Sequence, residues 1–232
     1  MDGLKQAASV GGRGFMVVCD GSNGAGKTTL LESLNMYLQR RGFDVVLSRE
    51  PGGTPVGERI RELLLDPGLP EMCDLTELLL FAAARAQHLQ EKILPALGAG
   101  KVVLCDRFDS ATFAFQQYAR GLDAGMVTRV NELALNGFRP DLYLILDLDP
   151  LLGLERVKQR GANLDRLEAE KLAFLQRARE GFLHQAKADP HRFRVLDASR
   201  GADEVADEAR ALIEELISGF SARAPGSRAA NS

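Results

Sequence analysis

Residues 15–30 read FMVVCDGSNGAGKTTL, and this stretch decides the fold. A short apolar run leads into a glycine-rich loop, which is followed by the start of an amphipathic segment. From Gly21 to Thr28 the loop fits the pattern G-x-x-x-x-G-K-[ST] without a mismatch. In a strand–loop–helix context, such a loop binds nucleoside triphosphates, because its backbone N–H groups and the helix N-terminus attract phosphate oxygens.

The polar side chains of this loop have separate expected roles. The Lys27 ammonium brings positive charge to the phosphates, and the Thr28 hydroxyl is placed for Mg²⁺. The residues expected to bind ATP are Gly21, Ser22, Asn23, Gly24, Ala25, Gly26, Lys27 and Thr28. The loop by itself does not separate a kinase from a switch or a motor. The sequence contains no N-K-x-D motif of a Ras-type GTPase, and the third apolar run ends in CDRFD rather than in the acidic pair usual in helicases.

Outward from the loop, apolar runs alternate with helical stretches. Strands are expected within 15–20, 44–50, 101–107, 139–150 and 192–199, and helices over 28–42, 55–66, 75–100 and 202–220. Continuously apolar strands separated by helices predict a parallel sheet covered on both faces. We therefore expect an α/β protein, a three-layer P-loop NTPase fold with a five-stranded parallel sheet flanked by helices. The expected single domain spans 15–220, between a flexible N-terminal extension at 1–14 and a disordered tail at 221–232.

Composition and charge narrow the class of protein. The chain has 232 residues, of which 45% are hydrophobic, and its net charge of −3 argues against a general nucleic-acid surface. The N-terminus lacks the apolar core of a signal peptide, and no run approaches the roughly 18 apolar residues of a membrane span. Cys19 and Cys105 each end an apolar run, so both are expected in the core. We expect a soluble cytoplasmic protein with no nucleic-acid or membrane partner.

Two strand ends carry residues suited to phosphate chemistry. In SREPGGTP (48–55), Arg49 could clamp a phosphate, and Glu50–Pro51 is a candidate cis peptide in a tight turn. In LCDRF (104–108), Asp106 could meet the Mg²⁺ hydration shell, and Arg107 could reach a transferring phosphate. The alternatives are an ordinary turn with a solvated arginine and a surface ion pair.

A helical segment offers residues suited to a base. In LLLFAAARAQH (78–88), Phe81 and Arg85 are four residues apart and therefore share one helix face. The ring could stack on a base while the guanidinium bonds to its edge. The alternative is a core phenylalanine with a solvated arginine. His88 is expected at the surface or in an interface.

Taken together, these segments resemble those of bacterial thymidylate kinases over about residues 15–215. The segments that carry the resemblance are DGSNGAGKTT, SREPGGTP, FAAARAQH, CDRFDSATFAFQ, RPDLYLILDLDP and RGANLDRLE. The resemblance implies a homodimeric kinase that uses ATP and Mg²⁺ to phosphorylate thymidine monophosphate (dTMP) to the diphosphate, for dTTP synthesis. It implies a mobile lid at about 154–168, whose hinge-side pattern includes Asp165 and Arg166.

The resemblance also implies roles for individual residues. The catalytic residues would be Lys27, Arg107, Arg156 and Arg160. The acceptor would be bound by Arg49, Phe81, Arg85, Arg107, Thr112 and Gln116, and the metal by Thr28 and Asp106.

The sequence departs from the family pattern in two places. Asn23 stands where the family usually has Asp or Glu facing the acceptor sugar. The segment AFQQYARG (114–121) replaces AYQGxGRG, so Phe115 stands in place of tyrosine, and Gln117 and Ala119 in place of glycines, which adds bulk near the expected acceptor pocket. Two alternatives stay open: a paralogous kinase with a different or modified nucleoside monophosphate, and an inactive nucleotide-binding protein.

Overall fold

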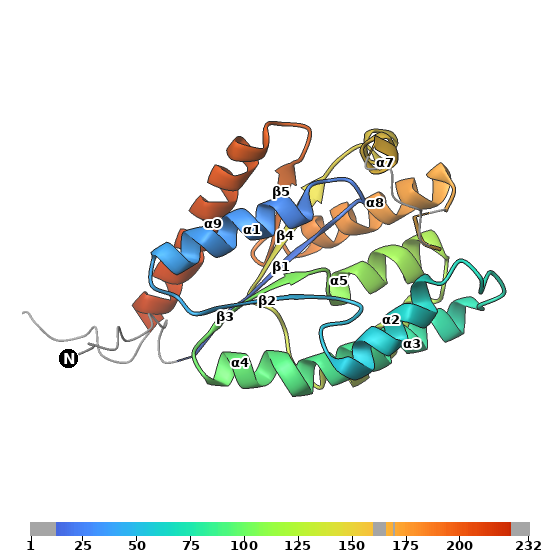
Figure 1. Cartoon of the computed structure of the whole chain (residues 1–232), viewed down its shortest axis with the longest axis horizontal. Helices are drawn as coiled ribbons and strands as arrows, with labels where there is room; N and C mark the ends of the chain where they lie inside the picture. The colour runs from blue at the N-terminus through green and yellow to red at the C-terminus, as the bar shows by residue number, and fades with distance from the viewer. Residues whose placement is uncertain (1–12, 160–165, 169, 224–232) are drawn as a thin grey trace, which may run out of the picture.

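A parallel sheet of five strands runs through the middle of the molecule (Figure 1). The computed structural model describes residues 13–159, 166–168 and 170–223. The strands lie in the order β2-β3-β1-β4-β5, and every neighbouring pair is parallel. Their bounds are β1 (Met16–Gly21), β2 (Val45–Arg49), β3 (Val102–Asp106), β4 (Leu142–Asp147) and β5 (Phe193–Asp197). The predicted five-stranded parallel sheet is confirmed.

Helices cover both faces of this sheet, as the continuous apolar strands predict. Alternate residues of β1 point to opposite faces: Val17 belongs to one buried cluster and Val18 to the other. The first face is covered by α1 (Lys27–Arg40) and α9 (Ala202–Arg223). The second face is covered by the helical segment 74–98 and by α8 (Leu172–Ala188). The remaining helices are α2 (Pro55–Leu65), α5 (Asp109–Thr112), α6 (Ala124–Leu135) and α7 (Pro150–Gln159).

Two π-helical segments interrupt the helices on the second face. The helix expected over 75–100 consists of α3 (Asp74–His88), the π-helical η1 (Leu89–Ile93) and α4 (Leu94–Gly98). The second segment, η2 (Phe113–Ala119), continues α5 and packs along α8. Such segments are rare and occur frequently at functional sites. The sequence analysis assigned no helix to α6 or α8.

The structure describes two residues before the expected domain at 15–220 and three residues after it, while 1–12 and 224–232 lie outside the described residues. Arg13 donates to Asp141 over 2.6 Å and the Gly14 N–H bonds to Leu97 O, so both residues already contact the sheet domain. Helix α9 continues to Arg223, three residues into the expected tail. Cys19 and Cys105 are fully buried, as predicted. In the described part of the chain, no helix has the length and apolar character needed to cross a membrane.

Candidate active site

The glycine-rich loop connects β1 to α1 at the carboxyl end of the central strand. Gly21, Gly24 and Gly26 all have positive φ angles, which favour glycine. The Lys27 ammonium donates to the carbonyl of Ser22 over 2.9 Å, so the side chain folds back over the loop. Burial, followed by the nearby Arg107 guanidinium, lowers the pKa of Lys27 to about 8.

Helix α7 packs directly against this loop through two glycines. A Cβ atom on Gly24 would lie 2.3 Å from the carbonyl oxygen of Gly153, and a Cβ on Gly153 would lie 2.4 Å from that of Asn23. From the same helix, the Arg156 guanidinium donates to the Gly24 carbonyl over 3.4 Å and to the Ala198 carbonyl over 3.3 Å. Arg156 therefore contacts the phosphate loop.

Arg107 lies at the centre of the site, directly after β3. Its guanidinium donates to Asp20 and to the Gly21 carbonyl over 2.9 Å each, and to the Asn23 side-chain oxygen over 2.5 Å. Its guanidinium carbon is 5.1 Å from the centroid of the Phe115 ring. Its φ of 67° is a left-handed conformation that costs about 1–2 kcal/mol for a non-glycine residue. These contacts explain how the side chain is held beside the phosphate loop.

Asp20 is the buried partner that the sequence analysis did not single out. Its carboxylate accepts from Arg107, from the Ser110 hydroxyl over 2.7 Å and from the Gly21 N–H over 3.0 Å. Burial raises the pKa of Asp20, and the Arg107 guanidinium opposes that shift. Its position at the end of a buried strand, beside the loop, was the available signal.

One cleft joins the loop to the predicted acceptor residues. It has a volume of about 210 Å³ and lies at the carboxyl ends of β1, β2 and β3. On the loop side it is lined by Asn23, Gly24, Gly26, Lys27 and Thr28. On the other side it is lined by Arg49, Phe81, Arg85, Thr112 and Gln116, with Asp106 and Arg107 between the two groups. Gly21, Ser22, Ala25 and Arg156 are not among the residues that line it.

The acceptor-side residues differ in their exposure. Arg49 is exposed and pairs with Glu58 over 3.0 Å. Phe81 is half-buried in the cleft wall. Arg85 is 1% exposed, so the alternative of a solvated arginine is wrong. The Thr112 hydroxyl is buried and has no hydrogen-bond partner among the described residues, which leaves it available for a ligand.

His88 is not at the surface, and the expectation for it is wrong. It is completely buried, with its ring nitrogens near Glu50 and Ser48. Helix α3 has a wide buried face, and His88 lies on it. The spacing of apolar residues does not show that a polar residue such as histidine belongs to the buried face, so the sequence alone did not reveal this. The peptide bond between Glu50 and Pro51 is cis, as predicted.

The family model described as thymidylate kinase matches residues 19–209. The chain belongs to the thymidylate kinase family. The thymidylate kinase of Geobacillus thermodenitrificans is 46% identical over 207 residues, which cover 89% of this chain and 92% of that protein. That of Ectopseudomonas mendocina is 48% identical over 88% of this chain and 97% of its own.

The fold comparison agrees with this assignment. The crystal structure of thymidylate kinase from Ehrlichia chaffeensis superposes with a TM-score of 0.71 at 32% identity, covering 86% of this chain and 98% of that one. The P-loop NTPase fold expected from the sequence is therefore confirmed, and the enzyme is a kinase of the nucleoside monophosphate class.

The departures from the thymidylate kinase pattern lie partly outside the cleft. From η2, the residues that line the cleft are Phe115 and Gln116. Tyr118 instead packs on α8, where its ring centroid is 5.5 Å from that of His184. The Ala119 carbonyl accepts from Arg177 of the same helix. Residues 117–119 are thus not among the residues that line the cleft, and Tyr118 and Ala119 contact α8 instead, so the structure gives no support to the expectation that this segment adds bulk near the acceptor.

Glu77 is a second buried carboxylate that the sequence analysis did not single out. It accepts from Gln116 over 2.9 Å, from Arg120 over 3.1 Å and from Arg166 over 2.5 Å. Burial alone would raise the pKa of Glu77, but Arg120, Gln116 and Arg166 together lower it below its ordinary value. Arg166 also donates to the Leu64 carbonyl. Glu77 thus connects the cleft-lining Gln116 to the turn at 166–168.

Only part of the predicted lid can be placed. Residues 154–159 continue α7, and 166–168 form a turn whose last two residues line the cleft. Residues 160–165, which include Arg160 and Asp165, lie outside the described residues.

Proposed function

We propose that this thymidylate kinase family member transfers the γ-phosphoryl group of ATP to dTMP for dTTP synthesis. The observation that carries the proposal is that one cleft holds both the phosphate loop and the acceptor-side residues, with Arg107 between them. Phosphoryl transfer requires alignment of donor and acceptor and neutralisation of charge, with little covalent chemistry from the protein. Lys27, Arg49 and Arg107 supply positive charge along the cleft. Arg156 and Arg160 are proposed to add charge from the lid.

A Mg²⁺ ion fits the residues at the loop. Thr28, at the start of α1, and Asp106, at the end of β3, line the same cleft, and both offer oxygen atoms, which Mg²⁺ prefers. Among the described residues there is no cluster of three His, Cys, Asp or Glu side chains that could hold a metal. A Mg²⁺ ion held by few protein oxygens, by water and by substrate phosphates agrees with this. When bound, it would neutralise phosphate charge.

The base side of the cleft favours thymine or uracil over cytosine. The guanidinium of Arg85 can only donate hydrogen bonds. Thymine presents an acceptor oxygen at position 4, whereas cytosine presents an amino donor there. Phe81 offers a ring for stacking from the same helix face. The unpartnered Thr112 hydroxyl supplies a further polar contact.

A panel of acceptors tests the proposal. With ATP and Mg²⁺, ADP release is expected to be fastest with dTMP, to be slower with deoxyuridine monophosphate and to be lowest with the cytidine, guanosine and adenosine monophosphates. The slower rate with deoxyuridine monophosphate follows from the missing methyl group, which is worth about 1–3 kcal/mol in an apolar pocket. Fastest turnover of any other monophosphate would indicate the paralogous kinase, and no turnover with any acceptor would contradict the proposal.

Asn23 is proposed to face the acceptor sugar, as the family resemblance implies. Its side-chain oxygen already accepts from Arg107, and a carboxylate would keep that contact. Because charge-assisted hydrogen bonds are roughly twice as strong as neutral ones, we expect Asn23→Asp to lower the KM for dTMP several-fold. Steady-state kinetics with dTMP and with its 3′-deoxy analogue check this. An equal gain with the analogue would show that the sugar hydroxyl is not the partner.

A homodimer is part of the proposal. Leu75 and Leu79 are about half exposed and lie one turn apart on α3, and Leu133 on the neighbouring α6 is 83% exposed. Such an apolar surface on adjacent helices suits packing against a second copy. The proposed location is the cytoplasm, with no nucleic-acid or membrane partner.

A further inference from the structure

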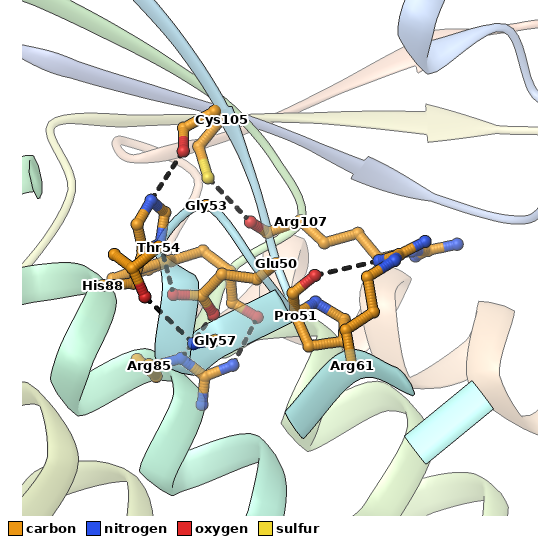
Figure 2. A network of polar contacts seen from close by, with 12 residues as sticks. Glu50, Pro51, Gly53, Thr54, Gly57, Arg61, Arg85, His88, Cys105 and Arg107 are labelled. Atoms are coloured by element: carbon orange, nitrogen blue, oxygen red, sulfur yellow. Dashed lines mark hydrogen bonds and ion pairs between the residues drawn. The ribbon is translucent and has the colours of Figure 1, made fainter. Parts of the chain in front are cut away.

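A buried polar network lies behind the base side of the cleft and connects it to the loop after β2. Figure 2 shows Glu50 between Arg85 and His88, with its carboxylate directed at both. The side chains of Arg85, Glu50 and His88 are 1%, 3% and 0% exposed. They come from two parts of the chain, since Glu50 follows β2 and the other two belong to α3.

The network fixes the plane of the Arg85 guanidinium. Nε donates to Glu50 over 2.9 Å, Nη1 to the Asn131 side-chain oxygen over 2.7 Å and Nη2 to the Phe108 carbonyl over 3.0 Å. Three acceptors from three directions hold a planar group in one orientation. The guanidinium has two more N–H groups, one on Nη1 and one on Nη2, and no described residue accepts from them. They remain for a ligand. A fixed plane determines where those two N–H groups point.

His88 holds the Glu50 carboxylate, and Ser48 holds His88. Because a carboxylate can only accept, Nδ1 of His88 carries the hydrogen of its 3.1 Å contact with Glu50. The other ring nitrogen lies 2.6 Å from the Ser48 hydroxyl. Ser48, Arg49 and Glu50 are consecutive, so the strand end that presents Arg49 to the cleft also presents the acceptor for Arg85.

The loop after Glu50 closes over this network. A Cβ on Gly53 would lie 2.7 Å from the Ser48 hydroxyl and 2.8 Å from Nε2 of His88. Its φ of 80° also disfavours any side chain. The loop can approach the histidine this closely only with glycine at this position.

Stability does not explain the network well. Burying an ion pair has a large desolvation penalty, and apolar residues of similar volume often do as well or better. An ion pair with directed hydrogen bonds fixes the orientation of the Arg85 guanidinium, which apolar residues cannot do. The pair also sits where the orientation is needed, because Arg85 and Glu50 both line the cleft.

We propose that Glu50 and His88 are positioning residues for the base: they orient Arg85 toward the edge of the pyrimidine and tie its place to that of Arg49. This inference rests on the proposed function, because it takes Arg85 as the residue that meets the base. The acceptor class is a nucleoside monophosphate whose base presents a keto oxygen.

The test is a KM-against-kcat comparison on the full chain. Glu50→Gln removes the negative charge and leaves one acceptor oxygen for the two donors, Arg85 Nε and His88 Nδ1. Losing a hydrogen bond to a charged group lowers affinity by about 10- to 100-fold, and we expect this variant to raise the KM for dTMP by that factor. The KM for ATP is expected to stay within about twofold, because the loop side keeps its contacts. The control is Asp141→Asn, which removes an ion pair with Arg13 before β4, at the opposite end of the strands. It is expected to change neither KM.

A double-mutant cycle separates positioning from a merely structural role. If Glu50 acts through Arg85, Glu50→Gln adds less than about a twofold change in kcat/KM once Arg85 is alanine. Effects that multiply in the double variant would overturn the proposal. An equal rise in the KM for ATP and for dTMP would do so too, because it indicates general disruption.

Histidine variants keep the test decisive if Glu50→Gln does not fold. Asparagine can place an amide donor near the position of Nδ1, so His88→Asn is expected to keep the wild-type KM for dTMP, whereas His88→Leu raises it. Equal KM values in the two variants would refute the role of the donor. Failure of the proposed function is distinct, because the wild-type enzyme would then show no turnover of dTMP. If dTMP is turned over and Arg85→Ala leaves its KM unchanged, this inference alone fails.

Discussion

Lys27→Ala is expected to lower kcat by about 10³-fold or more, the scale of losing one preorganised charge from a phosphoryl-transfer site. The ammonium lies in the loop and donates to the Ser22 carbonyl, so bound phosphates would lie within its reach. Steady-state kinetics and thermal unfolding of the same preparation measure the effect and the integrity of the fold. The matched control is Lys101→Ala, which removes an exposed lysine paired with Asp44. Near-normal activity of Lys27→Ala would remove this lysine from the site.

The lowered pKa of Lys27 adds a pH dependence to this prediction. The pKa of Lys27 is about 8, so the folded protein favours the neutral amine more than an unfolded chain does. Bound phosphates favour the ammonium. ATP binding is therefore expected to be strongest below pH 8, where Lys27 is already charged, and to weaken as the pH rises through that value. In Lys27→Ala this dependence is expected to disappear from the measured ATP affinity.

Arg107→Ala is expected to lower kcat by about 10³-fold, as for other arginines that stabilise a transferring phosphoryl group. Its guanidinium lies between the loop and the acceptor side, where it contacts Asp20, the Gly21 carbonyl and Asn23. Arg107→Lys is not expected to restore activity, because a single ammonium cannot reproduce this planar set of donors.

Stability must be measured alongside this second prediction. Removing the guanidinium leaves the buried Asp20 carboxylate without its cation, so the free energy of unfolding at neutral pH is expected to fall. Rates are therefore compared at a temperature where both proteins are folded. Arg194→Ala, which breaks an exposed pair with Glu215, serves as the control and is expected to leave kcat unchanged. A loss of less than about tenfold in Arg107→Ala would contradict the central role of this residue.

The sequence predicts most of the fold because its strands are easy to recognise as apolar runs. The inner strands β3 and β4 are continuous apolar runs that end in an aspartate, and β1 is an apolar run that ends in Asp20 and Gly21, which is the pattern of a buried parallel strand. The edge strands are less regular, since β5 contains Arg194 within its run. The helix α8 was not assigned, although Phe174, Ala178 and Phe182 repeat at every fourth position along its buried face. This apolar repeat directly follows the charged segment at about 154–168. That segment was assigned as the lid, and the residues after it were not assigned to any element.

The sequence predicts residues that line the cleft, but it does not predict the buried polar residues that hold those cleft residues in place. Lys27, Arg49, Asp106 and Arg107 occur at strand ends or in the loop, where ligands collect in parallel sheets. Glu77 and His88 lie inside helices, where spacing cannot tell a buried polar partner from an exposed one. Their roles depend on contacts with residues tens of positions away, such as the 38 positions between Glu50 and His88. Only the folded chain brings such partners together.

The contact between Gly24 and Gly153 has a consequence for how this enzyme can evolve. One glycine belongs to the phosphate motif, and the other lies 129 positions later, in no recognisable motif. The backbone of Gly153 nevertheless fills the space that a methyl group on Gly24 would need, and the carbonyl of Asn23, the neighbour of Gly24, fills the space that a methyl group on Gly153 would need. Selection is therefore expected to act on the two as one site. Among related sequences, a larger residue at either position should be found only where the loop and the helix have moved apart. A scan for the motif alone would rate Gly153 as freely replaceable, although it is as restricted as the residue that it touches.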